Sequence, residues 1–170
     1  MPEPKKHFEN RGWIESVLRY VPGFKGYLEK EYRREADDLL RGWLADRLKR
    51  SKRGLDAGAL ALTEAGQIDQ LPQIERLRAR LDKLAARIAS AMQGYSGFFD
   101  LVQVDEGVLD RLYEYDLALM EQVTKLADHV EEVKTVVAET VSERVAPLLE
   151  DIEKLEDDWD KREDLLRGLE

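Results

Sequence analysis

The chain contains no cysteine, only two histidines, and few glycines and prolines (11 and 5 among 170 residues). Without cysteine it cannot form disulfides, thiolate nucleophiles or cysteine-ligated zinc sites. Scarce Gly and Pro, together with abundant Ala, Leu, Glu and Arg, favour helix over strand. No segment alternates apolar and polar residues with period two, so we predict no sheet. The fold class that we expect is therefore all-α.

Long apolar runs are also missing. No stretch approaches the roughly 20 apolar residues that a membrane-spanning helix needs. The N-terminus lacks the apolar segment of a secretory signal. We therefore expect a cytoplasmic protein, with a disordered leader over residues 1–9.

Charge is plentiful but unevenly distributed, with a net value of -9. Residues 1–54 carry 14 Lys and Arg against 9 Asp and Glu, whereas residues 101–170 carry 8 against 21. Phosphates would be repelled by the acidic second half, which makes nucleic acid an unlikely partner. The basic and acidic parts could attract each other, either within one chain or between chains.

Apolar residues recur at helical spacing through most of the chain. We expect helices over residues 11–20, 27–53 and 69–93, with a loose glycine-containing connector over residues 54–68. The third helix has the cleanest pattern, since its apolar residues alternate steps of three and four. Such a seam suits left-handed packing against other helices, and it predicts a three- to four-helix bundle over residues 10–140.

The last helix is expected to begin at Glu106 and to run nearly to the C-terminus, with a kink beside Pro147. A helix of about 60 residues would be roughly 90 Å long, far beyond the others. Residues 141–170 are therefore predicted to form an acidic, coiled-coil-like extension. Its apolar seam consists of Val141, Val145, Leu148, Ile152, Leu155 and Trp159.

Exposing this seam to water would be costly, at about 1.5–3 kcal/mol for each large apolar side chain. Either the tail folds back at Pro147, or it pairs with another molecule. We favour pairing, and so expect a homo-oligomer or a helical protein partner.

Two features near the N-terminus could also bind a partner. An apolar face, which could lie on an anionic membrane surface or dock on the bundle, comprises Trp13, Ile14, Val17, Leu18 and Phe24. A basic run, which could contact an anionic surface or simply cap its helix, comprises Arg47, Lys49, Arg50, Lys52 and Arg53.

Active-site chemistry is poorly supported. Neither His7 nor His129 has an acidic residue three positions before it, as di-iron helical proteins require. The acidic clusters lack the glycine-bearing loop of a calcium-binding EF-hand. No serine stands in a Gly-x-Ser-x-Gly turn, and no phosphate-binding glycine loop is present. We expect no catalytic residues, no metal and no cofactor.

These patterns favour a non-enzymatic structural or adaptor protein that acts through helix–helix association with itself or with a partner. The alternative is a peripheral membrane-associated protein that uses the N-terminal amphipathic helix. A metal-binding or enzymatic helical bundle has the least support.

Overall fold

The structure is a computed structural model that describes residues 12–91, 96–101 and 104–168. Within these ranges the chain is helical and contains no strand, which confirms the all-α prediction. The leader predicted over residues 1–9 lies outside the described residues.

The long helices follow one another with short connections. Residues 12–18 are helical, and a 3-10 turn η1 (Lys30–Tyr32) leads into the first long helix. The remaining elements are α2 (Arg33–Ser51), α3 (Arg53–Glu64), η2 (Ile68–Gln70), α4 (Leu71–Ser90), α5 (Ser96–Asp100), α6 (Glu106–Glu131), η4 (Glu132–Thr135), η5 (Ala138–Thr140) and α7 (Val141–Arg167).

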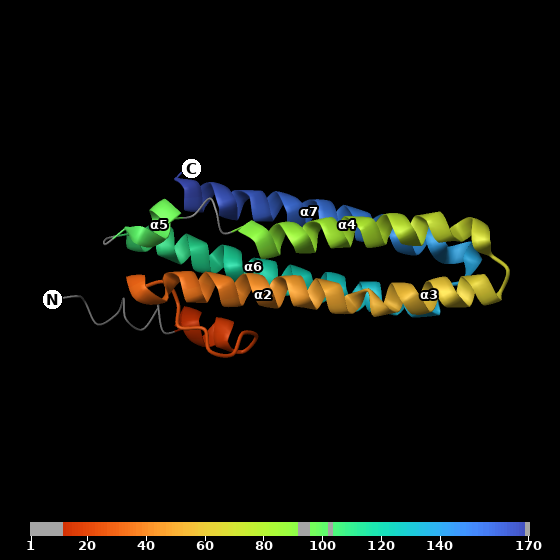
Figure 1. Cartoon of the computed structure of the whole chain (residues 1–170), viewed down its shortest axis with the longest axis horizontal. Coiled ribbons are helices and arrows are strands. Elements are labelled where there is room, and N and C mark those ends of the chain that lie inside the picture. Colours follow the sequence, from red (N-terminus) through yellow and green to blue (C-terminus); the bar gives the residue numbers. More distant parts are fainter. Residues whose placement is uncertain (1–11, 92–95, 102–103, 169–170) are drawn as a thin grey trace.

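Figure 1 shows an elongated molecule in which α3 continues the line of α2, while α4, α6 and α7 run beside it. Helix α2 contacts α4 and α6, and α7 contacts the same two helices, so that the four helices enclose one apolar core. The seam of α4 faces this core. Its buried residues are Ile74, Leu77, Leu81, Leu84, Ala85 and Ile88.

The prediction of one long final helix is wrong. The chain leaves helical geometry between α6 and α7, where Val136 and Val137 are both extended. Val and Thr are frequent from Val133 to Val141, and their branched side chains lower helix propensity. Pro147, by contrast, lies inside α7 near its start and does not end it.

The break reverses the chain, so that α7 returns along α4 and α6 (Figure 1). The predicted extension over residues 141–170 is therefore wrong for the described part. All six residues of its seam are at most 4% exposed: Val141, Val145, Leu148, Ile152, Leu155 and Trp159. Because the chain itself covers this seam, no second molecule is needed to remove it from water.

The loose connector predicted over residues 54–68 is also wrong, because most of it forms α3. Two of its glycines allow a close approach between backbones. A Cβ atom on Gly54 would lie 2.5 Å from the Glu131 Cα atom, and one on Gly58 would lie 2.6 Å from the Val133 carbonyl oxygen. The glycines thus let α3 pack directly against the chain around the end of α6.

This contact makes a stability prediction. We expect Gly54→Ala to lower the free energy of unfolding by about 1–3 kcal/mol, since the added methyl group meets rigid backbone. The matched control is Gly42→Ala in the middle of α2, where a Cβ atom meets nothing within 4 Å. There we expect a gain of about 0.5–1 kcal/mol from helix propensity. Urea denaturation measures both changes, and equal effects would contradict the role assigned to Gly54.

Candidate functional site: a buried polar cluster and the charged surface

The N-terminal segment, residues 12–27, packs onto the long helices with its apolar face inward. Val17 is fully buried and Phe24 is 2% exposed, while Trp13 and Ile14 are partly buried against the core. The Trp13 ring stacks on Tyr113 of α6, with 6.3 Å between ring centroids. Of the five residues predicted to face lipid or a partner, Leu18 alone is exposed, at 40%. Of the two alternatives for this face, the structure has the docked one, because Tyr20 packs on Trp43 of α2 and Trp13 on Tyr113 of α6.

Tyr27 ends this segment and enters the core. Gly26, immediately before it, has a φ of +85°, and a Cβ atom there would lie 2.5 Å from the Tyr113 hydroxyl oxygen. Glycine is therefore required on both grounds. The close approach lets the Tyr27 backbone N–H donate to that hydroxyl oxygen over 2.8 Å. The Nε atom of Arg33 donates to the Tyr27 carbonyl oxygen over 2.7 Å.

Five buried side chains then meet between the helices, and we call them the buried polar cluster: Tyr27, Asp37, Arg41, Asp116 and Arg162. The Tyr27 hydroxyl donates to Asp116 Oδ2 over 2.5 Å. Arg162 donates from Nε to Asp116 Oδ1 over 2.7 Å and from Nη2 to Asp37 Oδ1 over 2.8 Å. Arg41 Nε donates to Asp37 Oδ2 over 2.7 Å. The cluster thus joins α2, α6, α7 and the N-terminal segment.

The cluster is sealed from solvent. Arg41 is 3% exposed and the other four residues are fully buried. The Arg162 guanidinium also lies over the Trp159 ring, with its Cζ atom 5.1 Å from the ring centroid. Two guanidinium groups face two carboxyl groups, so the charges balance when both carboxyls are ionised. A buried set of paired charges stabilises one arrangement of helices, since any misaligned helix leaves a charge without its partner.

Burial also shifts the acid–base behaviour of these groups. Desolvation raises the pKa of Asp116 to about 6, although the Arg162 charge and the Tyr27 hydrogen bond both act to lower it. Desolvation likewise raises the pKa of Tyr27 well above its usual value, and the neighbouring Asp116 charge adds to the rise. At neutral pH Tyr27 is therefore a neutral donor and Asp116 an ionised acceptor.

None of these five residues was a candidate from the sequence, yet a signal was present. Asp116 falls between Leu112 and Leu119 on the apolar seam of α6, and Arg162 falls between Trp159 and Leu166 on that of α7. A charged residue at a seam position is expensive to bury unless it is paired. Such positions therefore point to a buried ionic contact between helices.

The predicted basic run does not form one site. Arg47 pairs across to α6, where its Nη1 atom lies 3.0 Å from Glu131 Oε1 and its Nη2 atom contacts Asp128. Lys52 pairs with Asp82 of α4. Lys49, Arg50 and Arg53 are exposed, and Arg53 Nε donates to the Arg50 carbonyl oxygen over 3.2 Å. Two residues of the run therefore cross-link helices, and the other three remain at the surface.

Ion pairs also join α4 to α7. Arg80 Nη2 lies 2.8 Å from Glu156 Oε2, and Arg87 Nη2 lies 2.8 Å from Glu163 Oε2. The predicted attraction between residues 1–54 and residues 101–170 operates within the chain at Arg47, which pairs with Asp128 and Glu131. Each pair is partly exposed, so each contributes at most about 1 kcal/mol.

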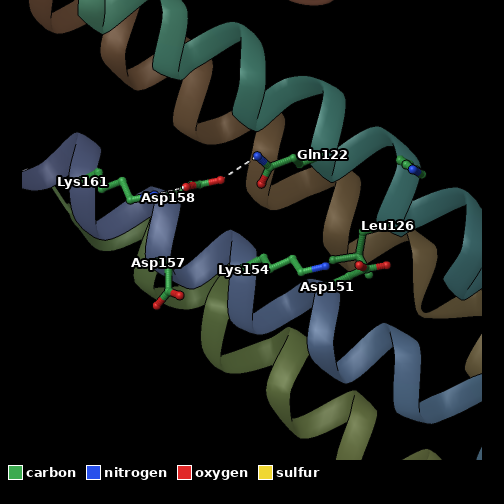
Figure 2. A pocket seen from close by; sticks show the side chains of 8 residues that line it. Gln122, Leu126, Asp151, Lys154, Asp157, Asp158 and Lys161 are labelled. Atoms are coloured by element: carbon green, nitrogen blue, oxygen red, sulfur yellow. Dashed lines mark hydrogen bonds and ion pairs between the residues drawn. The ribbon is translucent and has the colours of Figure 1, made fainter.

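A polar groove of about 370 Å³ lies between α6 and α7 (Figure 2). At one end Gln122 Nε2 donates to Asp158 Oδ2 over 2.7 Å, and Lys161 Nζ lies 2.8 Å from Asp158 Oδ1. The Lys161 hydrogen bond lowers the pKa of Asp158 below its usual value. Lys154 and Asp151 line the groove further along. The lining therefore mixes both signs of charge, and its best-placed carboxylate already has partners.

No three acidic, His or Cys side chains within the described ranges are grouped so that they could hold a metal ion. His129 is exposed on α6, and His7 lies outside the described residues. None of the described helices combines the length and the apolar character needed to cross a membrane.

The docked N-terminal segment makes a prediction that separates two residues of one apolar face. We expect Phe24→Ala to lower the free energy of unfolding by about 3 kcal/mol, because it empties a buried position. Leu18→Ala should change it by no more than about 0.5 kcal/mol, since that side chain is exposed. Urea denaturation of both variants is the measurement. Similar small losses would mean that the segment does not pack on the helices.

The buried polar cluster predicts a dependence of stability on pH. The pKa of Asp116 rises from its ordinary 3.8 to about 6 on folding, so the folded state binds more protons between these values. The contribution of Asp116 is thus largest at low pH and is lost as pH rises through about 6. We expect the stability of the wild type relative to Asp116→Asn to fall by about 2 kcal/mol from pH 4 to pH 7. Urea denaturation across this range tests it, and a constant difference would contradict the raised pKa.

The comparisons with known proteins give no family. No family model matches the chain, and neither a curated protein nor a solved structure matches it. The function is therefore argued from the geometry of the chain itself.

Proposed function

We propose that the protein is a non-enzymatic structural or adaptor protein that acts by contact with a partner. The observation that carries this proposal is the closure of the buried polar cluster. The cluster combines a carboxyl group of raised pKa, a tyrosine hydroxyl and two guanidinium groups, which are side chains that could serve in catalysis. All of them are at most 3% exposed and hydrogen-bonded to one another. They are arranged to hold helices together, and a substrate cannot reach them.

The contact surface cannot be the one expected from the sequence, because the seam of α7 is buried. The opposite side of α7 remains available. It carries carboxylates at steps of seven, three and four residues, which places them along one face of the helix. We call this set the acidic stripe: Glu143, Glu150, Glu153, Asp157, Asp160 and Asp164.

The acidic stripe suits a basic partner. It extends over roughly 30 Å at 1.5 Å per residue. Glu150, Glu153 and Asp157 are exposed at its centre, and Figure 2 shows Asp157 directed away from Gln122 and α6. Asp160, further along, is paired with Arg87 of α4. Like charges would repel two stripes from each other, so we propose that the partner presents a Lys- and Arg-rich surface.

Self-association is a narrower form of the same proposal. The exposed cations Lys49, Arg50 and Arg53 of one copy could meet the acidic stripe of another. Light scattering of the full chain at low and high salt distinguishes the two forms. A mass that is larger at low salt than at high salt indicates that copies assemble. A monomer mass at both salt concentrations indicates that the partner is a different protein.

The test reverses charges on and off the stripe. One variant combines Glu150→Lys, Glu153→Lys and Asp157→Lys. The control combines Glu35→Lys, Asp46→Lys and Glu64→Lys, three exposed positions on α2 and α3. Both variants raise the net charge from -9 to -3, so they differ only in where the charge lies.

We expect the stripe variant to capture about tenfold less of its partner, or less still, because repulsion replaces attraction at the interface. The control should retain the partner. The measurement is affinity capture from the native cell, with quantitative mass spectrometry of wild type, stripe variant and control side by side. Equal recovery of every captured protein by the two variants would overturn the assignment of the stripe.

A further inference from the structure

Helix α5, the start of α6 and the end of α7 come together at one end of the molecule (Figure 1). A second groove, separate from the acidic stripe, is lined by residues from these three parts. Its volume is about 520 Å³. Most of its lining is apolar and comes from three parts of the chain: Phe98, Leu101, Val104, Val108, Leu165 and Leu166. Leu165 and Leu166 are 4% and 3% exposed, whereas Leu101 is 51% exposed.

The wall that carries Leu101 is held in place by α2. Arg33, itself 3% exposed, donates from Nη1 to the Leu101 carbonyl oxygen over 2.5 Å. The neighbouring Arg34 Nη2 lies 2.8 Å from Asp100 Oδ1. A buried guanidinium that bonds a backbone carbonyl positions the wall through its main chain, so the apolar groove is formed before any ligand enters.

The polar part of the lining favours an anion. Arg111 and Arg167 both line the groove. Arg167 Nη2 lies 3.9 Å from Glu163 Oε2, which is longer than a hydrogen bond, and its side chain is 47% exposed. Asp105 also lines the groove, but its Oδ1 atom accepts the Gly107 backbone N–H over 2.7 Å as the cap of α6. The guanidinium of Arg167 can therefore take a further carboxylate in its usual two-bond geometry.

We propose that this groove binds a single-chain aliphatic carboxylate, with the chain against Phe98 and Leu165 and the carboxylate at Arg167. The volume falls within the roughly 300–1,000 Å³ of small-molecule sites. A segment of another protein is the competing occupant, and the experiment below separates the two. This proposal uses other residues than the acidic stripe does, so either can fail without the other.

The probe is 11-(dansylamino)undecanoic acid, whose fluorescence rises in an apolar environment, titrated against the full chain at low micromolar concentration. Its methyl ester is the matched probe without the charge. We expect saturable binding of the acid, displacement by decanoic acid, and binding of the ester that is about tenfold weaker. Failure of the acid to bind saturably, or equal binding of acid and ester, would overturn the proposal.

Three variants locate the binding. Val108→Glu places a carboxylate in the apolar lining and should weaken the acid probe by about tenfold or more. Arg167→Gln, at a side chain that is 47% exposed, should weaken the acid by about threefold and leave the ester unchanged. Ile68→Glu, at an exposed position in η2, should change neither. Circular dichroism confirms that each variant is folded.

Two outcomes contradict the site even if the probe binds. Unchanged affinity in both Arg167→Gln and Val108→Glu would place the probe elsewhere on the molecule. Binding of an uncharged leucine-rich peptide that decanoic acid does not displace, with no saturable binding of the acid probe, would identify a protein-docking groove.

Discussion

The arrangement of the helices centres on one buried guanidinium, that of Arg162. Asp37 of α2 and Asp116 of α6 both pair with it, and an unpaired charge in the core costs several kcal/mol. Tyr27 donates to the same Asp116, which brings the N-terminal segment to the same point. Apolar packing supplies most of the stability, but apolar side chains can repack when one helix shifts along another. The ion pairs of Arg162 form only at one relative position of α7 against α2 and α6, and so favour that register.

This arrangement decides which surfaces remain for a partner. Folding α7 back covers its apolar seam, and docking the N-terminal segment covers Val17 and Phe24. Much of the basic charge of the first half is consumed in pairs between helices, as with Arg47 and Arg80. The carboxylates on the outer side of α7 are what the packing leaves exposed. The proposed contact function therefore follows from the packing of the chain, since the most apolar stripes are satisfied internally.

The seam of α4 and the helix α3 show where sequence patterns succeed and where they fail. In residues 69–93 apolar side chains recur at steps of three and four, and those from Ile74 to Ile88 are buried. Residues 54–68 look like a connector because glycine weakens a helix locally. Gly54 and Gly58 instead serve a contact with residues 131 and 133, whose proximity no local pattern reveals. The buried polar cluster was missed for a similar reason, although Asp116 and Arg162 stand on the seams of their helices.

By itself the sequence determined that the chain is helical, and it determined which side chains form the apolar stripe of each helix. Both properties depend on residues within a turn or two of each other. Only the tertiary structure decided what covers each stripe, because that depends on contacts such as the one between Arg162 and Asp37, which are 125 residues apart. Covering a stripe removes the same apolar area from water whether the cover is its own chain or another molecule. The turn after Glu131 and the pairing of Arg162 resolve that choice in favour of the chain itself.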